Sequence, residues 1–441
     1  MILPRALPPR LRRIARLPLI SPRQWLRRVV FWVGAVLVAA VAIGFATLAD
    51  RASLLFVHIQ APHPWVALVI CPAGLVVSFL LTRHVFPGAQ GSGIPQVIAA
   101  QHMTDREAIA RVLSLRVALG KVGLTLLGLA CGASIGREGP TVQVGAAIMH
   151  ALGRVLRLPR LDLERALVLA GGAAGVAAAF NTPLAGVVFA IEELSHAFES
   201  RTSGVVLTAV IIGGITTLAL VGNYSYFGHT AATLDFGRGW VAVALCGVSG
   251  GFAGGLFSAA LVRFASGLPG RMGQLLVRYP VVFAAACGLA IALCGLLSGG
   301  QTYGTGYEQA RGMVEGVNTL PMAYAALKFI ATVVSYVSGI PGGIFAPSLS
   351  VGAGLGEALS HLMPLAPPGA VVLLGMVAYF SGVVQAPITA AVIVMEMTDN
   401  QGMTIPLLAA AFLAFGVSRL VCRRPIYAAL ARRFLAAQER R

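Results

Sequence analysis

Long apolar runs constrain the fold of this 441-residue chain more than any other feature of its sequence. The runs 29–49, 65–82, 204–221, 240–266 and 280–298 are each about as long as a helix that crosses a bilayer. Hydrophobic residues make up 57% of the chain and charged residues 11%, which argues against an ordinary soluble domain. Because backbone polar groups must be paired within a segment that crosses lipid, we expect an all-α polytopic membrane protein.

Basic residues gather at the two ends of the chain. The formal net charge is +17, and arginines crowd a basic N-terminal arm, 1–28, and a short basic C-terminal segment, 422–441. The positive-inside rule predicts that both termini are cytoplasmic. Since these residues flank membrane runs, they favour contact with anionic lipid, and we expect no nucleic-acid partner.

The six cysteines lie mostly inside apolar runs and show no Cys-x-x-Cys spacing. We expect small core residues, and neither a disulfide framework nor a metal site. They are Cys71, Cys131, Cys246, Cys287, Cys294 and Cys422.

The stretch Gly132–Pro140 places one carboxylate, Glu138, between glycines at the end of a long apolar run. A carboxylate in lipid-like surroundings is costly to ionise, which makes it a functional candidate. Gly136, Gly139 and Pro140 predict the start of a helix, whose free N–H groups and positive dipole end suit an anion. Glu138 and a free anion would therefore compete for one place.

A second glycine and proline break, Gly339–Pro347, indicates an internal duplication. We infer two membrane repeats, 29–225 and 226–421. The sequence leaves open whether the repeats are inverted, but inversion would aim both broken helices at a common site. A shift of 207 positions places Pro140 on Pro347, Lys121 on Lys328 and Gly145 on Gly352, and a shift of 204 places Gly171 on Gly375, Pro183 on Pro387 and Glu192 on Glu396.

Partial charges suit a transported anion, which must be held but also released. The sequence offers the backbone amides of Gly136–Gly139 and Gly343–Phe345, the hydroxyl of Ser92 and the phenol of Tyr427. An exposed Gly/Ser loop around Ser92 and an interfacial anchor at Tyr427 remain open alternatives.

Three motifs resemble the signature motifs of the CLC chloride channel and transporter family. The resemblance implies an inverted-repeat architecture of tilted and broken helices, and a homodimer with one anion path in each subunit. The motifs are Gly91–Pro95, Gly136–Pro140 and Gly343–Pro347, and the segments Phe180–Glu193, Glu396–Asn400 and Pro425–Tyr427 resemble bacterial proton-coupled members.

The resemblance also implies a chloride site. By it, Ser92 and Tyr427 are side-chain ligands of a central chloride, and the amides of Ile344 and Phe345 complete the site. Residues of the second motif, Arg137 and Gly139, are assigned to chloride as well.

Two glutamates supply the expected coupling. Glu138 resembles the external gating glutamate, which occupies an anion position when ionised and withdraws when protonated. Glu193 resembles the internal proton-transfer glutamate. We therefore expect a proton/chloride antiporter of a bacterial inner membrane, with chloride as transported ligand and no cofactor.

The sequence also allows other functions, which particular residues disfavour. A passive chloride channel is the nearest rival, but family channels replace Glu193 by a non-titratable residue. The nitrate exchangers carry proline where this chain has Ser92, and the fluoride branch departs at both positions. An intramembrane hydrolase lacks a His-Glu-x-x-His motif, and Ser195 and His196 have no placed third partner, so we expect no enzyme.

Several other polar residues have expected roles outside the chloride site. Lys121 is either an electrostatic partner of Glu193 or structural, and Glu192, Glu396 and Asp399 are expected to be helix-end polar groups. Gln96 stands where bacterial relatives often carry an acid. No CBS pair follows residue 427, so we expect no regulation by adenine nucleotides.

Overall fold

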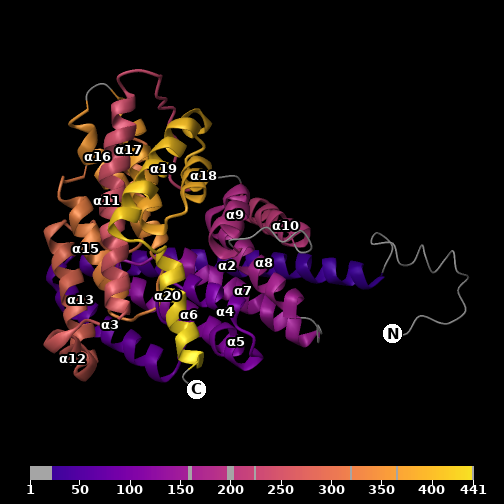
Figure 1. Ribbon diagram of the computed structural model, residues 1–441. Coiled ribbons are helices and arrows are strands. Elements are labelled where there is room, and N and C mark those ends of the chain that lie inside the picture. The colour runs from indigo at the N-terminus through magenta and orange to yellow at the C-terminus, as the bar shows by residue number, and fades with distance from the viewer. Residues whose placement is uncertain are drawn as a thin grey trace, which may run out of the picture.

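The computed structural model describes residues 22–156, 161–195, 203–222, 225–317, 320–363 and 366–439. Throughout these ranges the regular elements are helices, packed into one body (Figure 1). Most of the basic arm and His196 lie outside the described residues.

Eight helical stretches among the described residues are long and apolar enough to cross a membrane. The first, α2, continues well past the predicted run 29–49, to Gln60. The eight are α2 (Pro22–Gln60), α3 (Ala67–His84) after the short turn η1 (Pro64–Val66), α5 with α6 (Arg106–Leu113 and Leu115–Ala130), α8 (Leu161–Phe180), α10 (Ser203–Val221), α11 (Trp240–Ala265), α13 (Pro280–Leu297) and α19 (Thr404–Val421) after η3 (Gln401–Met403).

Shorter helices fill the space between these spans, and several begin at glycine or proline breaks. The connection 301–318, whose polar sequence we interpret as a loop, contains helix α14, so that interpretation was wrong. The shorter helices are α4 (Ile94–His102), α7 (Glu138–Val155), α9 (Pro183–Phe189) running into the π-helical turn η2 (Ala190–Ser195), α12 (Gly270–Arg278), α14 (Tyr307–Val314), α15 (Tyr324–Val337), α16 (Phe345–Ser360), α17 (Pro368–Val384), α18 (Pro387–Met397) and α20 (Ile426–Glu439).

The predicted duplication is visible in how the central helices cross. Helix α7 packs on α8 where a Cβ on Gly145 would lie 2.3 Å from the carbonyl oxygen of Gly171. Helix α16 packs on α17 at the equivalent pair, where a Cβ on Gly352 would lie 2.7 Å from the carbonyl oxygen of Gly375. Both crossings require glycine, because any side chain would force the two backbones apart.

Two acids predicted to be structural join the halves. The carboxylate of Glu192 accepts hydrogen bonds from the first free amides of α18, at Ile388 (3.2 Å) and Thr389 (2.6 Å). The carboxylate of Glu396 does the same for α9, at Leu184 (3.1 Å) and Ala185 (2.8 Å). A shift of 204 positions converts one set of bonds into the other, so each repeat caps a helix of the other.

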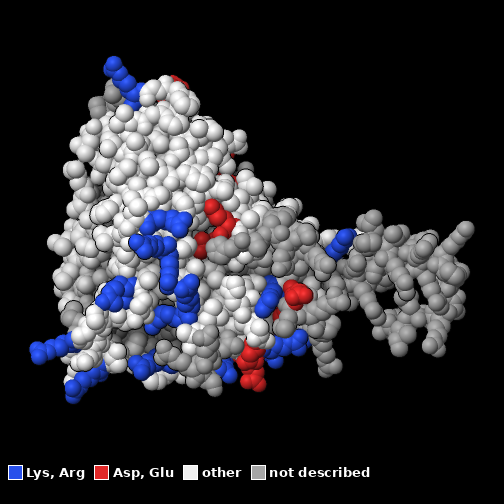
Figure 2. All heavy atoms as spheres, viewed as in Figure 1, with Lys and Arg blue, Asp and Glu red and all other residues white. Residues whose placement is uncertain are grey.

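The charged side chains are unevenly distributed over the surface. Figure 2 shows Lys and Arg gathered over the lower half of one face, around α12 and α20, whereas the upper part is nearly free of charge. The six cysteines are all buried and unpaired, which confirms the prediction of small core residues.

Candidate functional site

The two predicted helix starts lie side by side at the centre of the molecule. The amide of Gly136 donates to the carbonyl of Gly343 (2.8 Å), and the amide of Gly343 donates to the carbonyl of Gly136 (2.7 Å). These two glycines are related by the 207-position shift, so a residue of one repeat pairs reciprocally with its own equivalent. Such self-pairing places an internal two-fold axis between α7 and α16.

The glycine-rich loop before α4 approaches the same point. The amide of Gly91 donates to Ile340 O, and the amide of Gly342 donates back to Gly91 O, both at 3.1 Å. Gly93 caps α4 with a φ of 105°, a conformation that favours glycine. A Cβ on Gly139 would lie 2.2 Å from Ser92 Oγ, so the first turn of α7 contacts the serine directly.

Four helix N-termini therefore bring the sequence-predicted anion ligands together. Ser92 precedes α4, Gly139 lies in the first turn of α7, Phe345 begins α16 and Tyr427 lies in the first turn of α20. The rings of Phe345 and Tyr427 stack with centroids 6.1 Å apart. The free amides and the positive dipole end of a helix start suit an anion without a fixed cation.

The two hydroxyls at this place lack protein partners. Ser92 Oγ and the Tyr427 hydroxyl are fully buried, and neither has a hydrogen-bond partner among the described residues. The two hydroxyls are nevertheless neighbours within hydrogen-bonding reach of each other, and Glu193 and Tyr336 lie within electrostatic reach of Tyr427. Because buried hydroxyls are costly to leave unpaired, this pair fits a bound anion that accepts from both.

Glu138 lies on the other side of the paired glycines and is 1% exposed. Its carboxylate folds back over Gly136, where a Cβ would lie 2.3 Å from Oε2, and faces the backbone amides of Glu138 itself and Ala346. The hydroxyl of Tyr307 donates to Glu138 Oε1. The carboxylate thus occupies a position where amides from both repeats would otherwise face an anion.

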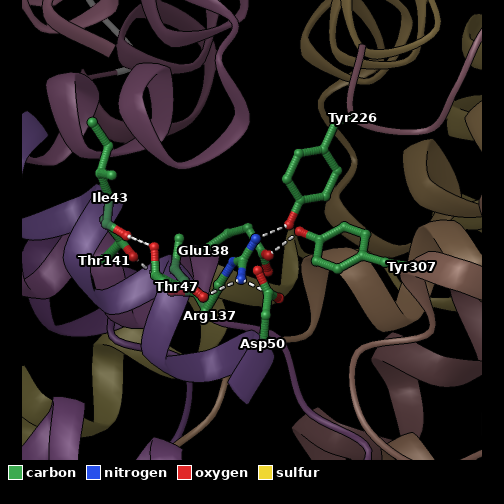
Figure 3. Close-up of polar contacts among 9 residues, drawn as sticks. Ile43, Thr47, Asp50, Arg137, Glu138, Thr141, Tyr226 and Tyr307 are labelled. Carbon is green, nitrogen blue, oxygen red and sulfur yellow. Dashed lines mark hydrogen bonds and ion pairs between the residues drawn. The ribbon is translucent and has the colours of Figure 1, made fainter. Parts of the chain in front are cut away.

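The Arg137 side chain is engaged elsewhere. Its guanidinium donates to Ala46 O (2.6 Å), to Asp50 Oδ1 and to the Tyr226 hydroxyl, and it lies over the rings of Tyr226 and Tyr307 (Figure 3). The Arg137 guanidinium is therefore occupied by protein partners, and only its backbone amide is left to face an anion.

Glu193 is 2% exposed and lies in the π-helical turn η2. Its Oε1 has no hydrogen-bond partner among the described residues. Lys121 donates to the carbonyls of Gln90 (3.3 Å) and Gly91 (2.8 Å). It therefore supports the glycine-rich loop that carries Ser92 before α4, which we call the serine loop. The described contacts include no ion pair between Lys121 and Glu193. Gln96 supports the same loop through Gln90 O at 2.7 Å.

Cavities flank the site on two sides. One of about 330 Å³ is lined by residues that include Asp50, Arg137, Tyr226 and Tyr307. Another, of about 960 Å³, reaches the serine loop and is lined by residues that include Gln90, Gly91, Tyr336, Arg278 and Arg433.

Three residues around Arg137 and Glu138 were not predicted from the sequence, namely Asp50, Tyr226 and Tyr307. Asp50 and Tyr226 belong to none of the sequence motifs. Tyr307 had a usable signal, because Gly304-Thr305-Gly306-Tyr307 repeats the pattern of Gly91-Ser92-Gly93-Ile94.

Comparisons with known proteins agree with this architecture. A family model described as voltage gated chloride channel matches residues 73–419. A solved structure of a slow cyanobacterial Cl⁻/H⁺ antiporter is 25% identical, with a TM-score of 0.79 over 94% of this chain and 99% of the other. A CLC-type fluoride/proton antiporter (22% identity, TM-score 0.79, 93% and 98% covered) and a eukaryotic CLC transporter (22%, 0.75, 92% and 74%) share the fold.

Proposed function

Because the chain belongs to the voltage-gated chloride channel (CLC) family, we propose that it exchanges chloride for protons across a membrane. One observation carries the proposal. Two buried neighbouring hydroxyls and the helix starts of both repeats lie at one place, and a buried carboxylate occupies the adjoining one. Chloride held by Ser92 and Tyr427, and by the amides of Ile344 and Phe345, would adjoin the position of the Glu138 carboxylate.

The proposed cycle follows from this competition. Ionised Glu138 holds the amides that an anion would use, and protonation removes its charge and weakens its hold on them. Chloride then enters the vacated position, and deprotonation later displaces it. One proton bound and one position freed are thus linked at a single side chain, which makes the movements of proton and chloride opposite.

Glu193 distinguishes this proposal from a passive channel. A proton crossing from the cytoplasmic side needs a titratable group near the inner end of the anion path, and Glu193 lies within electrostatic reach of Tyr427 there. The cyanobacterial antiporter that shares 25% identity supports the same choice. We propose chloride as the transported ligand, with no cofactor and no catalytic reaction.

The topology and assembly follow the same proposal. We place both termini in the cytoplasm of a bacterial cell, with the basic surface around α12 and α20 on that side (Figure 2). We also propose a homodimer, for which α10 and α19 present apolar faces with Ile215 60% and Ile405 59% exposed. The bilayer covers the remaining apolar surface.

Reconstituted vesicles provide the test. An imposed chloride gradient should drive protons in the opposite direction in the wild-type protein. Glu138→Gln and Glu193→Gln should each abolish proton movement, while chloride flux survives. Chloride flux without proton movement in the wild-type protein, at every pH, would replace the antiporter with the channel.

A further inference from the structure

Tyr307 reaches Glu138 from a second copy of the serine loop. Gly304 and Gly306 have φ angles of 65° and 83°, close to the 64° and 105° of Gly91 and Gly93. Lysines at equivalent positions hold the two loops, because Lys328 donates to Gly304 O at 2.8 Å as Lys121 donates to Gly91 O at 2.8 Å. The two loops are therefore structural equivalents from the two repeats.

The two loops now carry different chemistry. The first carries Ser92 between its glycines, next to the Tyr427 hydroxyl, whereas Tyr307, at the position of Ile94 after the second pair of glycines, donates its hydroxyl to Glu138. Tyr307 is buried and lies against Tyr226, with ring centroids 4.0 Å apart. Its ring is thus fixed by packing, and its hydroxyl has a single acidic acceptor.

We propose that Tyr307 is a positioning residue, a latch whose hydroxyl holds the ionised Glu138 carboxylate in the anion position. This proposal rests on the proposed function, since it assigns the residue that sets the pH at which Glu138 is protonated and the gate opens. A hydroxyl bonds a carboxylate more strongly than a neutral carboxylic acid, so the latch favours the ionised, closed gate. Because this hydrogen bond stabilises the ionised carboxylate, a higher proton concentration is needed to protonate Glu138 and admit chloride.

Other charged and titratable groups near Glu138 define the background against which the latch acts. Arg137 lies next to it in the chain and is itself paired with Asp50, so its charge is partly compensated. None of the described contacts gives Glu138 a second side-chain donor besides Tyr307. The groups facing this region are Arg137 at the start of α7, Asp50 from α2, Tyr226 from the loop before α11, Tyr307, Glu308 and Arg311 from α14, and Tyr427 from α20.

The test measures chloride flux in vesicles as a function of pH. Tyr307→Phe retains the ring and removes only the donor, so the ionised gate becomes less stable. The pH at which flux is half-maximal should move upward by about 1 to 2 pH units, the shift expected from one hydrogen bond to a charged group. A curve superimposed on that of the wild-type protein would overturn the latch.

Matched variants separate the latch from general damage to the fold. Tyr303→Phe removes a buried hydroxyl that donates to Ala292 O (3.1 Å) and should leave the curve in place. Tyr307→His keeps a ring donor and should shift the curve less than Tyr307→Phe. In a Glu138→Gln background, Tyr307→Phe should add no shift, and an equal shift there would show that Tyr307 acts without the carboxylate.

The same measurements keep the two proposals distinct. If Glu138→Gln retains the wild-type pH dependence, the gate itself is wrong and the proposed function fails. If Glu138→Gln removes the pH dependence but Tyr307→Phe leaves the curve unmoved, the antiporter stands and the latch alone is refuted.

Discussion

Replacing Gly139 by alanine tests the geometry of the proposed chloride site most directly. The new Cβ would lie 2.2 Å from Ser92 Oγ and 2.9 Å from the carbonyl oxygen of Ser92. Rotation of the hydroxyl relieves the first contact, but the second involves backbone. That backbone cannot retreat easily, because the neighbouring Gly91 is bonded on both sides to the loop at Ile340–Gly342.

The expected magnitude follows from these contacts. Inserting a methyl group into a packed site costs about 1–3 kcal/mol, and the strain here falls on the residue that would donate to chloride. Losing a hydrogen bond to a charged ligand costs about 1.5–3 kcal/mol, which corresponds to a fall in chloride affinity of roughly 10- to 100-fold. Because Glu138 keeps its own contacts, proton binding at the gate should change less than chloride binding.

Calorimetric titration of the purified protein with chloride measures this effect. Gly123→Ala in α6 is the matched control, since a Cβ there meets nothing within 4 Å. The control should bind chloride as the wild-type protein does. If Gly139→Ala folds and binds chloride with unchanged affinity, then Ser92 is not a ligand in the way the structure suggests.

The internal symmetry yields two further predictions. Glu192→Gln and Glu396→Gln should each lower thermal stability by a similar amount, about 1–2 kcal/mol, because each removes a charged cap from an equivalent helix; a large difference between the two melting temperatures would contradict this equivalence. Lys121→Met should weaken chloride binding, measured by calorimetry, because Lys121 supports the serine loop. Lys328→Met should mainly raise the pH of half-maximal flux in vesicles, because Lys328 supports the loop before Tyr307. If Lys121→Met mainly moved the pH of half-maximal flux and Lys328→Met mainly weakened chloride binding, the two loops would not divide these roles.

The long helices could be predicted from the sequence because length and hydropathy determine them. The run 240–266 became α11, Trp240–Ala265, and the run 280–298 became α13, Pro280–Leu297. The duplication was equally accessible, since glycines at close helix crossings and prolines at helix starts cannot be replaced freely. The helical part of 301–318 was missed because α14 is short and mostly polar, so neither length nor hydropathy marks it.

The surroundings of Glu138 could not be predicted in the same way. Asp50 lies in α2, and Tyr226 lies in the connection that precedes α11, so only the folded chain brings them to Arg137. The residues next to an acid in a long apolar helix do not indicate which distant residue will pair with it. Tyr307 differs, because the repeated Gly-x-Gly pattern before it could have been compared with the serine loop.

Broken symmetry at the centre of the molecule explains why only one repeat carries the proposed gate. The shift that pairs Gly136 with Gly343 also places Glu138 on Phe345, so a carboxylate and a phenyl ring occupy equivalent positions. Two carboxylates so close to one axis would repel each other, and two phenyl rings would leave no group to titrate. Phe345 is fixed among other aromatic rings, including Phe380 with its centroid 4.7 Å away, whereas Glu138 is held by polar contacts that protonation weakens. The site therefore combines a fixed ring, Phe345, with a side chain that can move away, Glu138. The proposed alternate occupation by a carboxylate and chloride requires this combination.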